Sequence, residues 1–261
     1  MMKITSRQNP LIRQYRALFR EKSARVEAGV AAVESVKLYN EAIKCGLSPA
    51  NVLVTEKMSA SGNADFSQKD GITVITEEIA AYISDTKSPQ GVFFQIKLLG
   101  NTDFPEEKLA KPGKYLFLDN MQEPGNVGAI IRAADAFGLS GVFLSESADV
   151  NSPKTLRGAM GSAFRMPLYE VPGAKTLTRL TQSGFAVYAA MLDDSAEKLP
   201  DVSFPEKTCV VIGNESRGVS AEIAGRCSGK VFIPIENAQS LGASAAAAIF
   251  AYALASSRFS R

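Results

Sequence analysis

The sequence of 261 residues contains no histidine, and this absence limits the chemistry that the chain can perform. Histidine is the commonest general base, the usual partner of a nucleophilic serine or cysteine, and a frequent metal ligand. A reaction site in this chain must therefore use carboxylates, arginine and lysine, hydroxyl groups and backbone groups.

Cysteine is scarce, and long hydrophobic runs are missing. Cys45, Cys209 and Cys227 are scattered and odd in number, so they predict neither a disulfide framework nor a metal site. Met1–Arg20 lacks the apolar core of a secretory signal. Ala243–Ala255 is shorter than the ~20 residues that a membrane-spanning helix needs. We expect a cytoplasmic protein with no metal and no membrane partner.

Charge is distributed unevenly, although the net charge is only +2. Residues 1–25 hold seven Lys or Arg residues against the single acid Glu21. This basic arm is a candidate for contacts with nucleic-acid phosphates, and the alternative is a solvated helix face. The candidate contacts are Lys3, Arg7, Arg13 and Arg16.

The patterning predicts two domains, residues 1–105 and 106–261. In the first, helical spacing of apolar residues covers 9–19 and 30–45, and strand-like runs cover 51–55, 72–75 and 92–96. Residues 99–113, with two prolines and two glycines, have the composition of a linker.

Beyond the linker, short apolar runs alternate with helical segments. The predicted strands cover 115–118, 142–144, 185–190, 209–212 and 231–235, and the predicted helices cover 127–137, 175–183, 220–227 and 240–257. This alternation predicts an α/β domain with a parallel sheet and helices on both faces.

Three segments place small or polar residues at the end of a predicted strand or just after it. They are Asn126–Gly138 (NVGAIIRAADAFG), Ile212–Ser220 (IGNESRGVS) and Ile233–Ser244 (IPIENAQSLGAS). Ligands of open α/β sheets bind at the carboxyl ends of the strands, so we expect one composite site. In their order and in their residues, the segments resemble the three motifs of the SpoU (TrmH-like) branch of the SPOUT RNA methyltransferases. Leu118–Gly125 and Asn151–Pro167 resemble the family's connecting segments.

The resemblance implies a function, a cofactor and an assembly. It implies transfer of a methyl group from S-adenosylmethionine to RNA, usually to a ribose 2′-hydroxyl, which requires no histidine and no metal. It also implies a small α/β RNA-binding domain, a catalytic domain with a trefoil knot, and a homodimer formed through that domain. The longer architecture favours large-subunit ribosomal RNA over transfer RNA as the substrate.

Two alternatives from other classes remain at this stage. A non-catalytic RNA-binding or ribosome-assembly protein could retain the same fold. A nucleotide-binding enzyme is disfavoured, because Val219 stands where the P-loop pattern requires lysine.

The resemblance also implies roles for individual residues. Asn126, Arg132 and Glu215 match the family's catalytic positions. A guanidinium keeps its proton in proteins, so Arg132 would hold a phosphate and stabilise the developing 2′-alkoxide instead of acting as a base. The bland alternatives are an arginine whose head reaches water, an asparagine that caps a helix, and a first-turn carboxylate.

Cofactor and RNA contacts follow from the same motifs. The positions matching cofactor contacts are Gly213, Asn214, Ile233, Ser240 and Leu241. Further candidate RNA contacts are Lys154, Arg157 and Arg165. One departure stands out, because Gly242 replaces the asparagine that is common in the family. The missing amide would have helped to place the 2′-hydroxyl, and Ser240 or Ser244 could compensate.

Overall fold

The computed structural model describes residues 2–61, 71–238 and 240–256, and the chain divides into two compact units. The first comprises Met1–Leu99 and Asn151–Phe164, and the second comprises Gly100–Val150 and Arg165–Arg261. This division differs from the predicted domains, 1–105 and 106–261, mainly because residues 151–164 group with the N-terminal residues.

The first unit is built on a five-stranded mixed sheet in the order β1-β4-β3-β5-β2. Strands β1, β4 and β3 are parallel to one another, whereas β5 pairs antiparallel with both β3 and β2. The strands are β1 (Met2–Ile4), β2 (Val30–Glu34), β3 (Ala50–Thr55), β4 (Thr73–Ile75) and β5 (Val92–Lys97).

Helices complete this unit, and Ile12, Tyr15 and Leu18 of the first helix lie in its core. They are α1 (Pro10–Arg20), α2 (Lys22–Ala28), α3 (Val36–Lys44), α4 (Glu56–Ala60), α5 (Glu77–Ile83) and α8 (Pro153–Ala159). The predicted helix over residues 30–45 is wrong, because its first part is strand β2. Residues 31–34 are all buried, and periodicity alone cannot distinguish such a short buried run from a helix. Ser35 then caps α3 through its side chain.

The second unit contains the predicted parallel sheet, with seven strands in the order β10-β12-β9-β11-β6-β7-β8. Every neighbouring pair is parallel. The strands are β6 (Gly113–Asp119), β7 (Gly141–Ser145), β8 (Leu168–Glu170), β9 (Ala186–Ala190), β10 (Glu197–Lys198), β11 (Lys207–Ile212) and β12 (Gly229–Phe232). The short strands β8 and β10 were not predicted.

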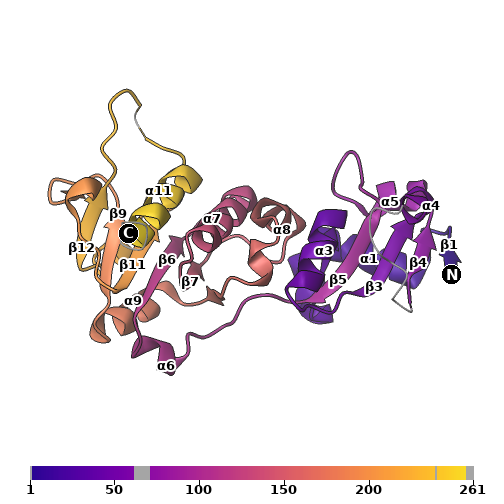
Figure 1. The fold of residues 1–261 in the computed structure, drawn as a ribbon, viewed down its shortest axis with the longest axis horizontal. Coiled ribbons are helices and arrows are strands. Elements are labelled where there is room, and N and C mark those ends of the chain that lie inside the picture. Colours follow the sequence, from indigo (N-terminus) through magenta and orange to yellow (C-terminus); the bar gives the residue numbers. More distant parts are fainter. Residues whose placement is uncertain (1, 62–70, 239, 257–261) are drawn as a thin grey trace. The chain divides into compact units, whose positions relative to one another are not determined.

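Helices lie on both faces of this sheet, which confirms the predicted fold class. Helices α7 (Pro124–Ala136) and α11 (Ala243–Ala255) pack together on one face, and α9 (Gly173–Gln182) covers the other (Figure 1). The α9 face also holds α10 (Ala221–Ala224), whose Ile223 joins Phe117 and Phe143 in the core. A short helix, α6 (Glu106–Leu109), precedes β6.

The last helix is anchored to the start of strand β6. Lys114 on β6 is buried, and its Nζ donates to the carbonyl of Leu254 at 2.9 Å. A cation at the carboxyl end of α11 interacts favourably with the helix dipole. This contact holds the carboxyl end of α11 against β6. None of the helices in the described ranges is long and apolar enough to cross a membrane.

Candidate functional site

The loop that follows β11 is folded tightly on itself. Asn214 and Gly218 exchange two backbone hydrogen bonds, of 3.0 and 2.9 Å. Gly213 is buried below this turn, and a Cβ on it would lie 2.0 Å from the carbonyl carbon of Gly218. Glycine is therefore required at position 213 by the loop itself, apart from any contact with a cofactor.

Glu215, at the tip of this loop, reaches the start of helix α7. Its carboxylate accepts hydrogen bonds from the backbone N–H groups of Gln122 (3.2 Å) and Glu123 (3.0 Å) and from Asn126 Nδ2 (3.1 Å). Partial burial raises the pKa of Glu215, but a hydrogen bond from its own backbone N–H, together with these three, outweighs the effect of burial and holds the pKa below its usual value. The structure thus joins two of the three motifs directly.

The beginning of α7 differs from the prediction. The helix starts at Pro124 with Glu123 as its N-cap, so Asn126 lies in the first turn and does not cap the helix. The carboxylate of Glu215 lies at the positive end of α7 and not at the helix that follows it in sequence. Sequence reasoning could not find this pairing, because its partners lie about 90 residues away.

Arg132 lies farther along the same helix and is exposed. Within residues 2–61, 71–238 and 240–256 its guanidinium has neither a hydrogen bond nor an ion pair. Both edges of the planar fork are therefore available to an incoming phosphate or hydroxyl.

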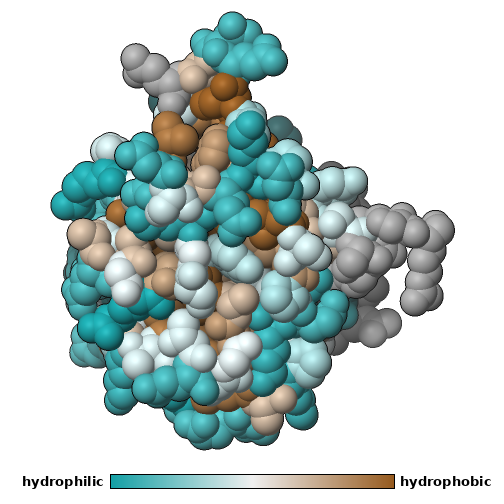
Figure 2. Space-filling view, turned by 90° about the vertical axis from the view of Figure 1, so that its left-hand side faces the viewer, coloured by the Kyte–Doolittle hydropathy of each residue, from teal (hydrophilic) through white to brown (hydrophobic). Residues whose placement is uncertain are grey.

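An apolar cavity of about 420 Å³ lies beside the third motif. Ile233, Ser240 and Leu241 line it, whereas the other two predicted cofactor contacts, Gly213 and Asn214, do not. Leu192, Ile235 and Leu241 remain 79%, 40% and 37% exposed. Figure 2 looks onto this side of the unit, where hydrophobic side chains gather below the segment that projects at the top of the view.

This cavity fits the cofactor that the motifs imply. Its volume lies in the usual range for small-molecule sites, and its walls are mostly apolar with a few polar groups. A bound adenosine would cover the three exposed apolar side chains, which otherwise face water. Met191 and Leu192 also line the cavity and were missed from the sequence. The apolar run that continues past the end of β9 was the available signal.

Gly242, the departure from the family pattern, caps helix α11 without a side-chain hydrogen bond. Its φ of −60° is ordinary, and a Cβ there would meet nothing within 4 Å. The backbone therefore does not require glycine at this position, unlike position 213.

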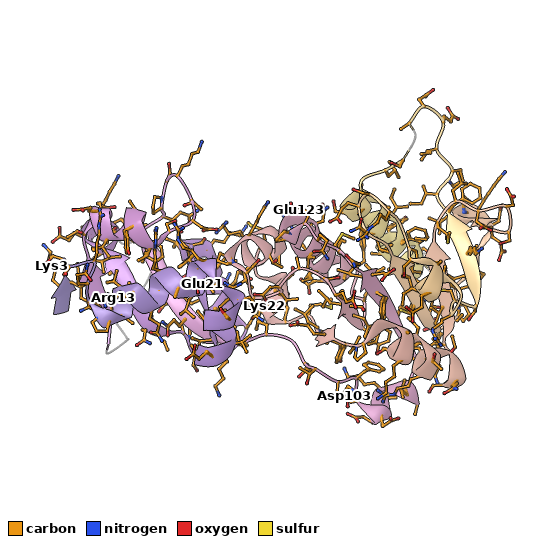
Figure 3. All side chains as sticks on the ribbon, turned by 180° about the vertical axis from the view of Figure 1, so that it is seen from behind. Lys3, Arg13, Glu21, Lys22, Asp103 and Glu123 are labelled. Carbon is orange, nitrogen blue, oxygen red and sulfur yellow. The ribbon has the colours of Figure 1, made fainter. Side chains whose placement is uncertain are left out.

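The basic arm is a folded part of the first unit, in β1, α1 and the turn between them. Lys3 and Arg7 pair with Glu56 and Glu78, each at 2.6 Å. Arg13 donates to Gln8, and Arg16 donates to the carbonyl of Tyr82 and lies over its ring. Lys3 on β1 and Arg13 on α1 both belong to this unit (Figure 3). Exposed ion pairs contribute little free energy, so a phosphate could displace these glutamates.

The other three predicted RNA contacts are also engaged. Arg157 forms a bidentate pair with Asp85 at 2.6 and 2.7 Å, within the first unit. Arg165 pairs with Asp135 at 2.6 Å in the second unit, and Lys154 has a partner as well. No group of three or more potential metal-ligating side chains occurs among the described residues.

Family models match both halves of the chain. A model described as the SpoU rRNA Methylase family matches residues 113–252, and one described as an MRM3-like substrate binding domain matches residues 9–93. The chain is 30% identical over 258 residues to a Bacillus subtilis protein named 23S rRNA (guanosine(2553)-2′-O)-methyltransferase RlmP. That match covers 97% of this chain and 99% of the relative.

Solved structures of methyltransferases are similar to this chain over nearly its whole length. The AdoMet complex of the SpoU methyltransferase AviRb from Streptomyces viridochromogenes superimposes with a TM-score of 0.83 at 25% identity. It covers 97% of this chain and 99% of that one. An AdoMet-bound rRNA methyltransferase from Sinorhizobium meliloti gives a TM-score of 0.82 at 25% identity, covering 97% and 96% of the two chains. The chain belongs to the SpoU rRNA methylase family.

Proposed function

We propose that this protein transfers a methyl group from S-adenosylmethionine to a ribose 2′-hydroxyl of large-subunit ribosomal RNA. The observation that carries the proposal is the hydrogen bond between Glu215 and Asn126, which ties the second motif to the helix bearing Arg132. Relatives that match over nearly the whole chain are named 23S rRNA 2′-O-methyltransferases, which supports the substrate class.

Arg132 carries the central role in the proposed reaction. When bound, the sulfonium cofactor would supply an activated methyl group, whose bond to sulfur would break as its bond to the 2′-oxygen forms, with neutral S-adenosylhomocysteine as the leaving group. Arg132 holds the neighbouring phosphate through two parallel N–H donors and stabilises negative charge as the 2′-oxygen forms its bond to the methyl carbon. The 2′-proton goes to that phosphate or to water, because a guanidinium cannot accept it.

Asn126 and Glu215 have a positioning role in this account. Glu215 fixes the first turn of α7, where Asn126 lies, and Arg132 projects from a later turn of the same helix. Gly213 shapes the loop that carries Asn214 and Glu215. Ile233, Ser240 and Leu241, which line the apolar cavity, would enclose the adenosine of the cofactor.

The remaining assignments concern RNA binding and assembly. Residues 1–105 would bind the RNA substrate, and 106–261 would carry out the transfer. Lys3, Arg7, Arg13, Arg16, Lys154, Arg157 and Arg165 are the proposed phosphate contacts. Exposed Ile249 and Tyr252 on α11 support a homodimer formed through the second domain, because large apolar side chains on one helix face favour association. The trefoil knot and a cytoplasmic location also belong to the proposal.

Gly242 favours a second candidate, a non-catalytic protein that binds RNA or assists ribosome assembly. Removing the amide that orients the acceptor would abolish transfer while leaving cofactor and RNA binding intact. A transfer RNA substrate is the other alternative within the same reaction class.

The test is methyl transfer from labelled S-adenosylmethionine to purified RNA from a strain that lacks the gene. A 2′-O-methylated linkage resists alkaline hydrolysis, since cleavage needs the free 2′-hydroxyl. Label in alkali-resistant dinucleotides of large-subunit RNA is expected. Label in alkali-sensitive material would indicate base methylation, label in transfer RNA would change the substrate, and cofactor binding without label would favour the non-catalytic protein.

A further inference from the structure

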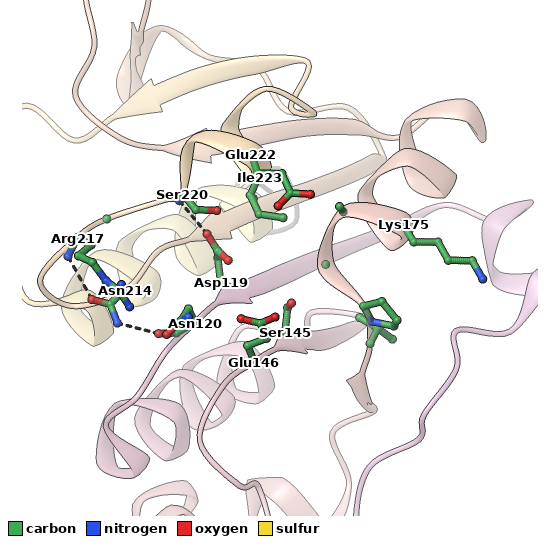
Figure 4. Close-up of a pocket in the computed structure, with 15 residues that line it drawn as sticks. Asp119, Asn120, Ser145, Glu146, Lys175, Asn214, Arg217, Ser220, Glu222 and Ile223 are labelled. Carbon is green, nitrogen blue, oxygen red and sulfur yellow. Dashed lines mark hydrogen bonds between the residues drawn. The ribbon is translucent and has the colours of Figure 1, made fainter.

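The second unit contains another cavity, of about 620 Å³, that shares no lining residue with the cofactor cavity. It lies where β6 and β7 end, beside the first turn of α9 and the loop after β11 (Figure 4). Asn214 and Arg217 of that loop line it. The loop therefore contacts helix α7 through Glu215 and this cavity through its neighbours.

Two buried polar side chains line this cavity. Asp119 and Ser145, the last residues of β6 and β7, are each only 7% exposed. One carboxylate oxygen of Asp119 accepts from the backbone N–H of Ser220 at 2.8 Å. The hydroxyl of Ser145 has no hydrogen-bond partner in the described part of the chain. Among the described residues, every fully enclosed side-chain nitrogen or oxygen has a hydrogen-bond partner. The unpartnered hydroxyl of Ser145 is therefore not fully enclosed, and it faces the cavity that Ser145 lines.

The wall formed by α9 is open to an anion. Its N-cap is Pro172, which offers no side-chain hydrogen bond, and the described residues provide no acceptor for the N–H groups of residues 173–175. A Cβ on Gly173 would lie 2.7 Å from Ser145 Oγ, so glycine at this position makes room for the hydroxyl. The positive end of a ten-residue helix thus lies beside Ser145.

The backbone just after β6 and β7 is strained. Asn120 and Glu146 follow β6 and β7 directly and have φ values of +56° and +48°. Gln122 Nε2 donates to Asn120 Oδ1 and to the carbonyl of Glu146, each at 2.8 Å, which holds both residues in place. Left-handed backbone at a non-glycine residue costs free energy and clusters at functional sites.

The charges select the class of ligand. Asp119, Glu146 and Glu222 disfavour a simple anion, whereas the start of α9 and Arg217 disfavour a simple cation. A ligand that carries both hydrogen-bond donors and a phosphate satisfies both sides. A nucleotide has this chemistry, since base N–H groups and ribose hydroxyls donate while the phosphate accepts.

We propose that this cavity binds one unpaired ribonucleotide of the RNA substrate, at a position other than the one methylated. Its phosphate lies at the start of α9, and its base or ribose donates to Asp119. This inference rests on the proposed RNA-directed function. It gives the loop after β11 a second role, because the same loop then contacts RNA on one side and supports the helix bearing Arg132 on the other.

The test uses the full chain and two variants. Ser145→Ala removes the unpartnered hydroxyl with little change in volume. Ala174→Asp places a carboxylate in the first turn of α9, where it stabilises the helix. The carboxylate would also occupy the proposed phosphate position and repel a phosphate there. Ser23→Asp is the matched control, because Ser23 is exposed and holds the same second position in helix α2. The probes are the four ribonucleoside 5′-monophosphates and inorganic phosphate, measured by ligand-observed NMR.

We expect saturable binding of at least one mononucleotide, and weaker binding of inorganic phosphate. Ser145→Ala should lower the affinity for the mononucleotide about three- to tenfold. Ala174→Asp should lower that affinity by at least about tenfold. Ser23→Asp should leave it unchanged. No mononucleotide binding, equal binding by the Ala174→Asp variant, or equal binding of inorganic phosphate would overturn the inference.

Cofactor affinity and methyl transfer separate this inference from the proposed function. Calorimetry should give equal affinity for S-adenosylmethionine in all four proteins, because the two cavities share no residue. Intact methyl transfer without mononucleotide binding would overturn the inference alone. Absence of both cofactor binding and methyl transfer would contradict the proposed function, whatever the mononucleotide result.

Discussion

Glu215 accepts a hydrogen bond of 3.1 Å from the side-chain amide of Asn126, 89 positions earlier in the chain. The same carboxylate accepts from two backbone N–H groups at the start of α7. One side chain thus fixes the first turn of the helix that carries Arg132. We therefore expect the orientation of Arg132 to depend on Glu215 through this helix, and the ionisation of Glu215 provides a test.

Unfolding should report this ionisation. The pKa of Glu215 is lowered in the folded protein, so its stabilising contribution is present above the usual value near 4.5 and is lost as pH falls through the lowered pKa. Glu215→Gln should remove that part of the pH dependence and cost about 1 kcal/mol at neutral pH, typical of a lost cap. Denaturant unfolding of both proteins from neutral pH to below 4.5 measures it. Parallel pH profiles would contradict this role.

The cofactor cavity predicts a selective loss of affinity. Leu241→Ala removes apolar surface from the cavity wall, so affinity for S-adenosylmethionine should fall about tenfold. The melting temperature should hardly change, because Leu241 is 37% exposed. Val26→Ala, which shortens an apolar side chain exposed in the first unit, is the control. Calorimetry giving equal affinities for both variants would place the cofactor elsewhere.

Gly242→Asn tests the departure from the family pattern. A Cβ at Gly242 meets open space, and asparagine is a good N-cap, so the variant should gain a few tenths of a kcal/mol in stability. Turnover should rise if the restored amide places the acceptor hydroxyl, whereas Gly242→Ala should not raise it. Greater stability with unchanged turnover would show that this amide has no part in transfer.

The cations of β1 and α1 predict a salt effect. A plot of the logarithm of RNA affinity against the logarithm of salt concentration should have a negative slope. Replacing Lys3, Arg7, Arg13 and Arg16 by glutamine should reduce the magnitude of that slope by up to roughly 3. Affinity for S-adenosylmethionine should not change. Lys198→Gln, at an exposed cation of β10, should leave the slope nearly as it was. An unchanged slope in the fourfold variant would mean that these side chains serve only their contacts within the first unit.

The sequence predicted the parallel sheet well, because its central strands are short apolar runs separated by helices. It failed at Val30–Glu34, a strand buried on both faces that has no alternating pattern. It identified Glu215 and Asn126 separately, but their bond depends on how the chain folds between them. The need for glycine at position 213 was also hidden, since it arises from close approach to Gly218 within the loop.

The most direct test of the central claim is single-turnover methylation at saturating cofactor and RNA. The account predicts that Arg132→Ala lowers the rate by about 10²–10³, with a smaller effect on RNA binding. Arg132→Lys should rescue little, because lysine keeps the charge but loses the planar fork. Arg226→Ala, which removes an exposed arginine that bonds Thr178, should retain the normal rate. A near-normal rate in the Arg132→Ala variant would contradict the proposed mechanism.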